Sequence, residues 1–262
     1  MEIRALSRAA QILASVSADT AGVTLSKIVE SASLSKATTY RFVQALLRLD
    51  FLRLEPETGA YYVGPALLRF GRLAQHHDNL RMMARPFLEE LRESTGETLT
   101  LVVPSGRHRL TVDVVLSEHE LRAAPEVGGI KPIHAGAAGK VMLAWYPEEE
   151  LLSLFGETAL KRVTPRTVSS VRVLERELAR IRERGYATST GETVYGQAAS
   201  AAALLGDDGK VVGSLNISGP TIRLAPATLR RNGELAATAA AKLSKKIGLR
   251  KPPRKSERRG AQ

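Results

Sequence analysis

The chain has 262 residues, 44% of them hydrophobic, a length and composition that suit two domains, each with a buried core. Its formal net charge is +11 and it has no cysteine, which excludes disulfides, thiolate catalysis and thiolate zinc sites. Residues 250–262 hold six basic side chains and one acidic one, so they alone supply +5 of the net charge. The charge of the whole chain is therefore a weak indication of a polyanionic partner, and we expect 250–262 to be a basic disordered tail.

The N-terminal stretch does not have the character of a signal peptide, because Glu2, Arg4 and Arg8 interrupt its apolar residues. No part of the sequence approaches 18 consecutive uncharged apolar residues, so we expect no membrane span. The expectation is a cytoplasmic protein with no membrane partner.

The first two predicted helices are amphipathic and short. Residues 5–17 place apolar side chains at helical spacing, and residues 25–31 do the same behind Thr24, which can cap the second helix. Each helix therefore has one face to bury against a neighbour.

The third predicted helix spans residues 35–48 and has two different faces. Ser35 can cap it, and Ser33, in the turn before it, stands where a positive φ is expected and glycine is common. Two helices joined by such a turn follow the helix-turn-helix plan. The predicted core stripe consists of Thr39, Phe42, Val43 and Leu46.

A hairpin follows the third helix. The letters FLRLE, PETG and AYYVG, residues 51–64, read as strand, turn and strand, because Pro and Gly supply the turn between apolar runs. Three helices followed by a hairpin form a winged helix-turn-helix, and we assign residues 1–64 to this DNA-binding domain.

The polar face of the third helix has no evident partner within the chain. A basic helix face is often only solvated, but the order of three helices and a hairpin favours DNA binding. In that interpretation the helix enters the major groove of double-stranded DNA, its N-terminus and Ser35 hold a phosphate, and Arg53 on the wing contacts the backbone. The predicted DNA contacts are Ser35, Lys36, Thr38, Thr39, Tyr40, Arg41, Gln44 and Arg53.

Residues 65–95 predict a helical linker. Breaks are expected at Gly71 and before Pro86, because Pro86 suits the first turn of a new helix better than the interior of one.

Strands and helices are interspersed without regular alternation in residues 96–249, which predicts a mixed α+β domain with a largely antiparallel sheet. The letters GDDGK, residues 206–210, read as a hairpin turn. The predicted strands are 98–103, 109–116, 120–124, 186–190, 199–205 and 210–218, and the predicted helices are 136–146, 148–155, 171–184 and 226–247.

No motif in the sequence predicts catalysis. The five histidines lack the spacing of a zinc site, and there is no nucleophile elbow. The segment HAGAAGK is not a phosphate loop, because His134 stands where glycine is needed and Val141 where Ser or Thr is needed. We therefore expect no enzyme, no catalytic residue, no metal site and no cofactor.

Several segments resemble the IclR-type transcriptional regulators. They are LSRAAQIL with TLSKIVESASLSKATTYRFVQALLRLDFL, YYVGPALLRFG, KPIHAGAAGKVMLAW, LARIRERGYATSTGE and GSLNISGP, and they run in order over residues 4–248. The resemblance implies a winged helix-turn-helix, a linker helix that helps dimerisation, and a GAF-like effector domain. It also implies a homodimer or a dimer of dimers that binds a promoter and responds to a small organic acid or an aromatic catabolite. A repressor and an activator fit these features equally.

The segment HAGAAGK, residues 134–140, is the candidate effector site. It opens a helix whose small residues let a ligand approach and whose free amides favour a carboxylate, although small residues also serve close packing. The resemblance implies that the ligand lies against Ala137 and Ala138. The effector-binding residues carried over in this way are Ala123, Ala137, Ala138, Ser189, Thr190, Ala199, Asn216 and Ser218.

The chain departs from the family pattern in this predicted pocket. Relatives commonly have acidic residues after GYA, followed by a cysteine and a proline. Here the matching positions read STG at 189–191, Ala199 and Ala203, and only Glu192 of the acidic group remains. The smaller, less acidic lining keeps a second function open, that of an effector-independent DNA-binding oligomerisation protein with a closed C-terminal pocket.

Overall fold

The computed structural model describes residues 3–17, 21–73, 78–156 and 160–249. The chain divides into two compact units, Met1–His76 and His77–Gln262, and each is described here by itself. The predicted basic tail, 250–262, lies outside the described residues. None of the helices in the described part of the chain combines the length and apolar character needed to cross a bilayer.

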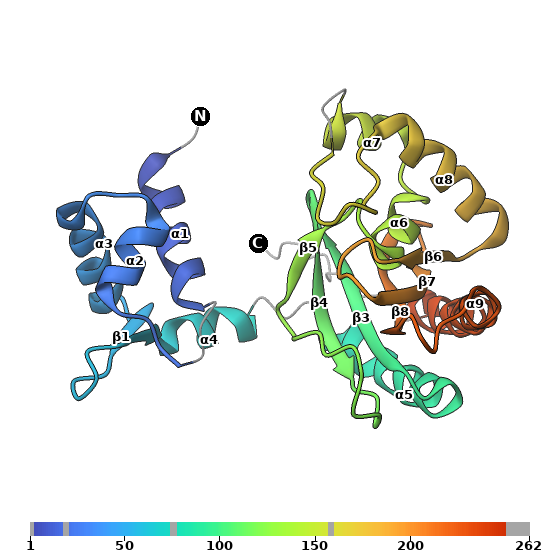
Figure 1. The fold of residues 1–262 in the computed structure, drawn as a ribbon, viewed down its shortest axis with the longest axis horizontal. Helices are drawn as coiled ribbons and strands as arrows, with labels where there is room; N and C mark the ends of the chain where they lie inside the picture. Colours follow the sequence, from blue (N-terminus) through green and yellow to red (C-terminus); the bar gives the residue numbers. More distant parts are fainter. Residues whose placement is uncertain (1–2, 18–20, 74–77, 157–159, 250–262) are drawn as a thin grey trace, which may run out of the picture. The chain divides into compact units, whose positions relative to one another are not determined.

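The first unit contains the predicted three helices and hairpin (Figure 1). Strands β1 and β2 pair antiparallel, with Arg53 opposite Tyr62. Val23 adds an isolated bridge to Tyr61, so the segment before the second helix is tied to the wing. The elements are α1 (Arg4–Ser17), α2 (Leu25–Ala32), α3 (Lys36–Arg48), β1 (Leu52–Leu54), β2 (Tyr61–Val63) and α4 (Pro65–Leu73).

The apolar faces of the three helices meet in one core. Ile12, Ile28 and Val43, one from each helix, are completely buried, and Leu52 and Tyr61 of the hairpin pack against the same cluster. The polar face of α3 is thereby turned outward, as the 3.6-residue period of the stripe requires.

The turn before α3 has the expected conformation without glycine. Ser33 has φ 53°, in the left-handed region. Ser35 caps α3, because its hydroxyl accepts a hydrogen bond from the Thr38 amide at 3.3 Å. The prediction for Thr24 was wrong in one respect, since it occupies the N-cap position of α2 but its side chain makes no capping hydrogen bond.

The predicted linker is divided between the two units. Helix α4 belongs to the first, and α5 (Asp78–Thr95) belongs to the second; residues 74–77 lie outside the described residues. The breaks expected at Gly71 and before Pro86 were wrong, because both residues lie inside helices. Pro86 is on the exposed side of α5. Proline lacks the amide N–H for the helix hydrogen bond, but the carbonyl left without it can bond to water there. Ala84 and Leu88, on the opposite side, are buried in the core and hold the helix in place.

The second unit is built on the predicted antiparallel sheet, whose strand order is β5-β4-β3-β8-β7-β6. The expected strand over 120–124 was wrong. Side chains, rather than a neighbouring strand, form hydrogen bonds with the backbone carbonyls of that segment. The Thr98 hydroxyl donates to the Ala123 carbonyl, and the Arg223 guanidinium donates to the Leu121 carbonyl. The strands are β3 (Thr98–Ser105), β4 (His108–Val115), β5 (Ile130–Pro132), β6 (Ala187–Thr190), β7 (Gln197–Leu205) and β8 (Val211–Pro220).

Helices cover both faces of this sheet (Figure 1). Because side chains alternate along a strand, Leu101 and Val103 pack with α5 and the last helix, whereas Val102 packs with α6 and α8 on the other face. The remaining helices are α6 (Ala137–Leu143), α7 (Glu148–Phe155), α8 (Val171–Arg184) and α9 (Pro226–Leu249).

Candidate functional site

The outward face of α3 is cationic and has no ion-pair partner among the residues that the structure describes. Lys36, Arg41 and Arg48 are exposed and form no ion pair with any described residue. Tyr40 is also half-exposed beside them. Such a face, presented by the second helix of a helix-turn-helix, is suited to phosphates and base edges.

An open groove of about 740 Å³ runs along this face of α3. Its lining includes the predicted Thr38, Arg41 and Gln44, and also Arg8 of α1, which was not predicted. The spacing of Arg4 and Arg8, four residues apart on one helix, is the sequence signal that could have pointed to it.

Two of the predicted DNA contacts, Thr39 and Arg53, lie away from the outward face of α3. Thr39 is completely buried, so its side chain faces the core rather than a groove, and including it among the contacts was wrong. Arg53 is exposed on the wing, where it stacks 4.4 Å from the ring centre of Tyr62 and pairs with Glu55 at 3.4 Å. It remains accessible, although Glu55 offsets part of its charge.

A cavity of about 160 Å³ opens on the α6 face of the sheet in the second unit. The strand register sets its floor, because Ser189, Ala199 and Ser218 stand side by side on β6, β7 and β8. In the next row Asn216 lies opposite Thr100 and donates a hydrogen bond to its hydroxyl at 3.1 Å. The floor is therefore small and polar.

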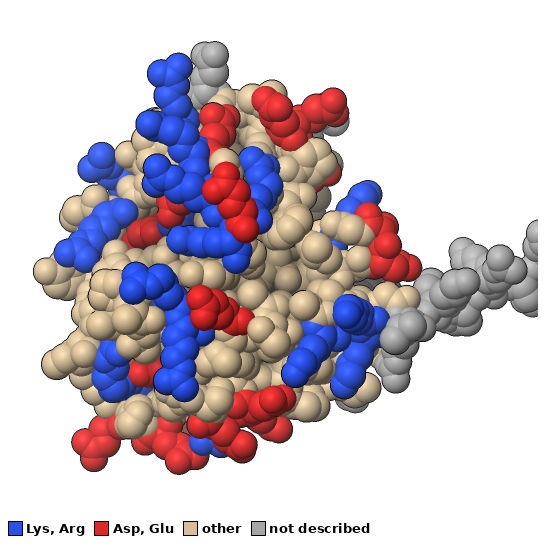
Figure 2. Space-filling view, turned by 90° about the vertical axis from the view of Figure 1, so that its right-hand side faces the viewer, with Lys and Arg blue, Asp and Glu red and all other residues tan. Residues whose placement is uncertain are grey.

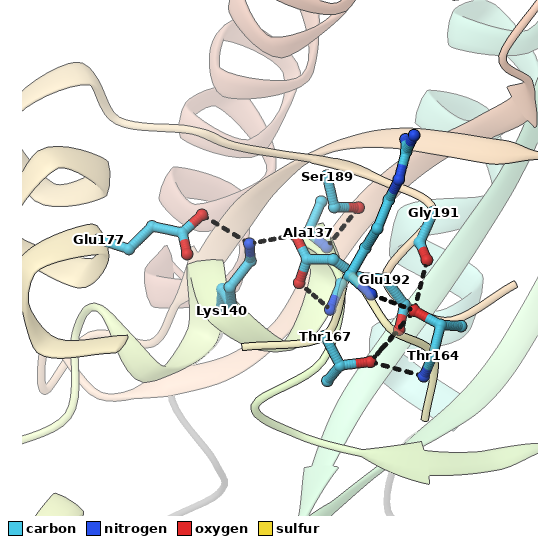
Figure 3. Close-up of polar contacts among 10 residues, drawn as sticks. Ala137, Lys140, Thr164, Thr167, Glu177, Ser189, Gly191 and Glu192 are labelled. Carbon is cyan, nitrogen blue, oxygen red and sulfur yellow. Dashed lines mark hydrogen bonds and ion pairs between the residues drawn. The ribbon is translucent and has the colours of Figure 1, made fainter. Parts of the chain in front are cut away.

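Two amides at the start of α6 form hydrogen bonds with side chains of the protein. The Gly136 amide donates to the Glu192 carboxylate at 3.1 Å, and the Ala137 amide donates to the Ser189 hydroxyl at 3.0 Å (Figure 3). Gly136 has φ 81°, and a Cβ there would come within 2.9 Å of Thr193. The amides of Gly136 and Ala137 are therefore not free for the carboxylate of a ligand, contrary to what was expected of these two positions.

Glu192 is held from several sides. Lys140, only 1% exposed, lies between Glu192 and Glu177 with ion-pair distances of 2.5 and 2.6 Å (Figure 3). The hydroxyl of Thr167 donates to the Glu192 carbonyl at 2.7 Å, and that of Thr164 to the Gly191 carbonyl at 2.6 Å. This network fixes the loop after β6 as one wall of the cavity.

Arg109 and Lys131 also line the cavity and were not predicted, and Nη2 of Arg109 is 3.3 Å from where a Cβ on Gly136 would stand. They are direct cross-strand partners on β4 and β5. Burial lowers the pKa of Arg109 to about 10, and burial together with the charge of Arg109 lowers the pKa of Lys131. The signal in the sequence is the polar series Arg109, Thr111 and Asp113, at every second position of an otherwise apolar strand.

Comparison with known proteins identifies both units. A model of the IclR helix-turn-helix domain matches residues 5–56, and a model of the bacterial transcriptional regulator IclR C-terminal matches residues 73–245. The chain belongs to the IclR family. It is therefore a DNA-binding transcriptional regulator, and its winged helix-turn-helix and α+β C-terminal domain are those of the family.

Relatives of this IclR-family chain match almost all of its length. The HTH-type transcriptional repressor AllR of Salmonella typhi is 31% identical over 250 residues, 95% of this chain and 92% of that protein. An IclR transcriptional regulator from Alicyclobacillus acidocaldarius superposes with a TM-score of 0.77 at 26% identity, over 95% of this chain and 100% of that one. An IclR homolog of Microbacterium hydrocarbonoxydans, solved in complex with 4-hydroxybenzoate, shares the fold with a TM-score of 0.74 at 23% identity, over 93% and 98%.

Six of the eight residues expected to bind an effector in this IclR-family chain lie at the cavity, namely Ala123, Ala137, Ser189, Ala199, Asn216 and Ser218. Ala138 and Thr190 do not line it. Ala138 follows Ala137 by one helical step, and its carbonyl accepts a hydrogen bond from Ser214 in the core. Thr190 alternates with Ser189 along β6 and is exposed.

Proposed function

We propose that the protein is a transcriptional repressor that binds a promoter through α3 and is modulated by a small organic acid in the cavity of its second unit. The observation that carries the proposal is the unpartnered cationic face of α3, with Arg41 and Arg48 exposed beside an open groove. The AllR relatives are named transcriptional repressors, which supports repression rather than activation.

The remaining predicted contacts divide by role. Ser35 and Lys36 at the start of α3 bind backbone phosphate, where helix amides and positive charge act together. Thr38, Tyr40, Arg41 and Gln44 contact base edges or the groove wall, and Arg53 on the wing contacts the adjacent backbone. The protein acts as a homodimer or a dimer of dimers, so that two α3 helices read two half-sites.

Effector control requires a difference in ligand affinity between two states of the assembly. A ligand that prefers one quaternary arrangement shifts DNA affinity by its coupling free energy. A cavity bounded by Ala137, Asn216 and Ser218 supports this version over the effector-independent one, for which a closed pocket is expected. The ligand-bound IclR homolog from Microbacterium hydrocarbonoxydans supports it as well.

The experiment that tests DNA recognition is the substitution Arg41→Ala, measured by fluorescence anisotropy on DNA from upstream of the protein's own coding sequence. With competitor DNA at physiological salt, losing a base contact is expected to cost about 1–3 kcal/mol, roughly a 5- to 160-fold loss of affinity. Arg69→Ala is the matched control, since Arg69 is exposed on α4. Full affinity and specificity in Arg41→Ala would show that this face does not read sequence.

A further inference from the structure

The wing, made of β1 and β2, is too small to keep one conformation by itself. Each strand has three residues, and an isolated pair of strands is at best marginally stable in water. Leu52 and Tyr61 anchor the inner side of the wing in the core, while Arg53 and Leu54 are exposed. The exposed side of the wing therefore needs contacts with another segment to hold its position.

Tyr62 provides such a contact with the segment before α2. Its hydroxyl donates a hydrogen bond to the Ala21 carbonyl at 3.0 Å, across 41 positions of the chain. The neighbouring Tyr61 exchanges backbone hydrogen bonds with Val23, at 2.8 and 3.0 Å. The wing is thus joined to the helix-turn-helix by a backbone tie and by a side-chain tie, and the second depends on the Tyr62 hydroxyl.

The backbone at Gly22 leaves room for the Tyr62 ring. A Cβ on Gly22 would come within 2.5 Å of the ring carbon Cζ, so no side chain fits between the ring and the backbone. Gly22 also has φ 88°, in the left-handed region that glycine adopts without strain. The absence of a side chain at Gly22 therefore lets the ring lie directly against the chain.

Arg53 lies on the ring that is held in this way. Arg53 and Tyr62 are direct cross-strand partners, and the guanidinium carbon of Arg53 is 4.4 Å from the ring centre, within the range of a cation–π contact. Stacking uses the flat face of the guanidinium and leaves the N–H donors along its edge. Nη1 meets Glu55 at 3.4 Å in an exposed pair that contributes little, and the other donors have no acceptor among the described residues.

An arginine held in this way is prepared to bind a phosphate. A free arginine on a surface gives up rotamer freedom when it binds, whereas an arginine already stacked on a ring has less to lose. The donors on its edge match the geometry of phosphate oxygens. The side chain of Arg53 is 53% exposed, so a DNA phosphate can reach those donors.

We infer that Tyr62 is a positioning residue for DNA binding, which orients Arg53 toward a backbone phosphate and is itself held by Ala21 and Gly22. The inference rests on the proposed function, because it assumes that the wing contacts DNA beside the groove that α3 enters. It adds that the contribution of Arg53 to DNA affinity depends on the Tyr62 ring.

The test is a double-mutant cycle of Tyr62→Leu and Arg53→Ala in the full chain, measured by fluorescence anisotropy on operator and competitor DNA. Arg53→Ala is expected to weaken binding to both DNAs by about three- to tenfold and to reduce the salt slope by about one, as for loss of one phosphate contact. Tyr62→Leu is expected to weaken binding by about threefold, and to have no effect in the Arg53→Ala background. An equal effect of Tyr62→Leu in both backgrounds would overturn the inference, because the ring would then act without Arg53.

Two further variants separate positioning from folding. Leu54→Ala changes an exposed side chain of the same hairpin that is no part of the stack, and is expected to leave DNA binding unchanged. Tyr62→Phe keeps the ring and loses only the hydrogen bond to Ala21, so it is expected to fold and to bind DNA more tightly than Tyr62→Leu does. If Tyr62→Phe binds as weakly as Tyr62→Leu, the ring is not the platform for Arg53 and the inference fails.

Nuclear magnetic resonance tests the stack in the free protein. The ring current of Tyr62 is expected to shift the signals of the Arg53 side-chain protons upfield in the wild type and in Tyr62→Phe, and the shift is expected to disappear in Tyr62→Leu. Unshifted Arg53 signals in the wild type would overturn the inference, whether or not Tyr62→Leu folds.

The outcomes also separate this inference from the proposed function. If Arg41→Ala loses operator preference while the Arg53 and Tyr62 substitutions leave binding unchanged, the proposed function stands and the inference fails. If Arg41→Ala keeps operator preference while the cycle shows coupling between Arg53 and Tyr62, the inference stands and the proposed role of α3 fails.

Discussion

His134 lies at the end of the β5 segment, just before α6, and its Nε2 is 2.9 Å from the Lys161 carbonyl. Its ring packs edge-on against Phe155. Burial lowers the pKa of His134, and the charges of Arg107 and His108 lower it further, against the opposing effects of the Lys161 hydrogen bond and Glu192. The ring is therefore neutral in the folded protein at neutral pH, with Nε2 as the donor to Lys161.

The lowered pKa of His134 predicts a loss of stability in mild acid. The unfolded chain binds a proton at the ordinary histidine pKa of 6.5, whereas the folded chain resists it until lower pH. The contribution of His134 to the free energy of unfolding is therefore fully present above this value. It declines as the pH falls from about 6.5 toward the pKa of His134 in the folded chain. Urea unfolding at pH 7.5 and 5.5 measures the decline.

Two histidine variants check the assignment to His134. His134→Gln keeps a donor for Lys161 without a titrating ring, so the decline should become shallower, while His119→Gln, at an exposed position, should keep it. Equal slopes in His134→Gln and the wild type would assign the acid sensitivity to other groups.

At the scale of elements, α6 depends on one close contact. A Cβ on Gly139 would come within 1.8 Å of the Ile133 carbonyl oxygen, so the helix lies directly on the chain that leads into it. This contact fixes how α6 packs against the segment before it, and Gly136 and Ala137 between them line the cavity.

Gly139→Ala is expected to destabilise the second unit by about 3 kcal/mol or more, because the backbone has to move to admit the methyl group. Gly71→Ala is the contrasting control, since a Cβ there meets nothing within 4 Å and alanine favours the interior of α4. That change should stabilise the first unit by about 0.5–1 kcal/mol. Chemical denaturation measures both, and a neutral Gly139→Ala would contradict the packing argument.

Much of the element order was predictable because it depends on neighbours along the chain. The stripe at 39, 43 and 46, the Ser35 cap and the turn at Ser33 are short-range patterns, and the structure contains each of them. The strand predicted at 120–124 does not form. Strand formation requires a neighbouring strand to pair with, and the local sequence carries no information on whether one lies next to this segment. The break predicted before Pro86 was wrong for a similar reason. The free energy gained by packing α5 into the core outweighs the local cost of proline in a helix.

At the scale of the whole molecule, the net charge of +11 has more than one source along the chain. The face drawn in Figure 2 has Lys and Arg interspersed with Asp and Glu rather than gathered in a patch of one sign. Without residues 250–262 the net charge would be +11 − 5 = +6. We therefore expect DNA affinity to have two separable sources, the face of α3 and the basic residues of 250–262.

Deleting residues 250–262 is expected to weaken nonspecific DNA binding and flatten its salt dependence, because fewer counterions are released. The preference for the operator over competitor DNA at physiological salt should persist, since it depends on α3. Anisotropy titrations on both DNAs at several salt concentrations measure the two effects. If operator preference disappears with the tail, the charge of residues 250–262 and not the α3 face is responsible for binding at that site.

The sequence by itself determined the winged helix-turn-helix, the class of the second domain and the outward face of α3, because periodicity, capping and turn residues act over a few positions. Only the tertiary structure decided the chemistry of the cavity. Arg109 and Lys131 meet through the register of β4 and β5, and Glu192, from a loop far along the chain, joins them only in the folded domain. Likewise, the amides of α6 are occupied by residues more than fifty positions away, which no local pattern could encode.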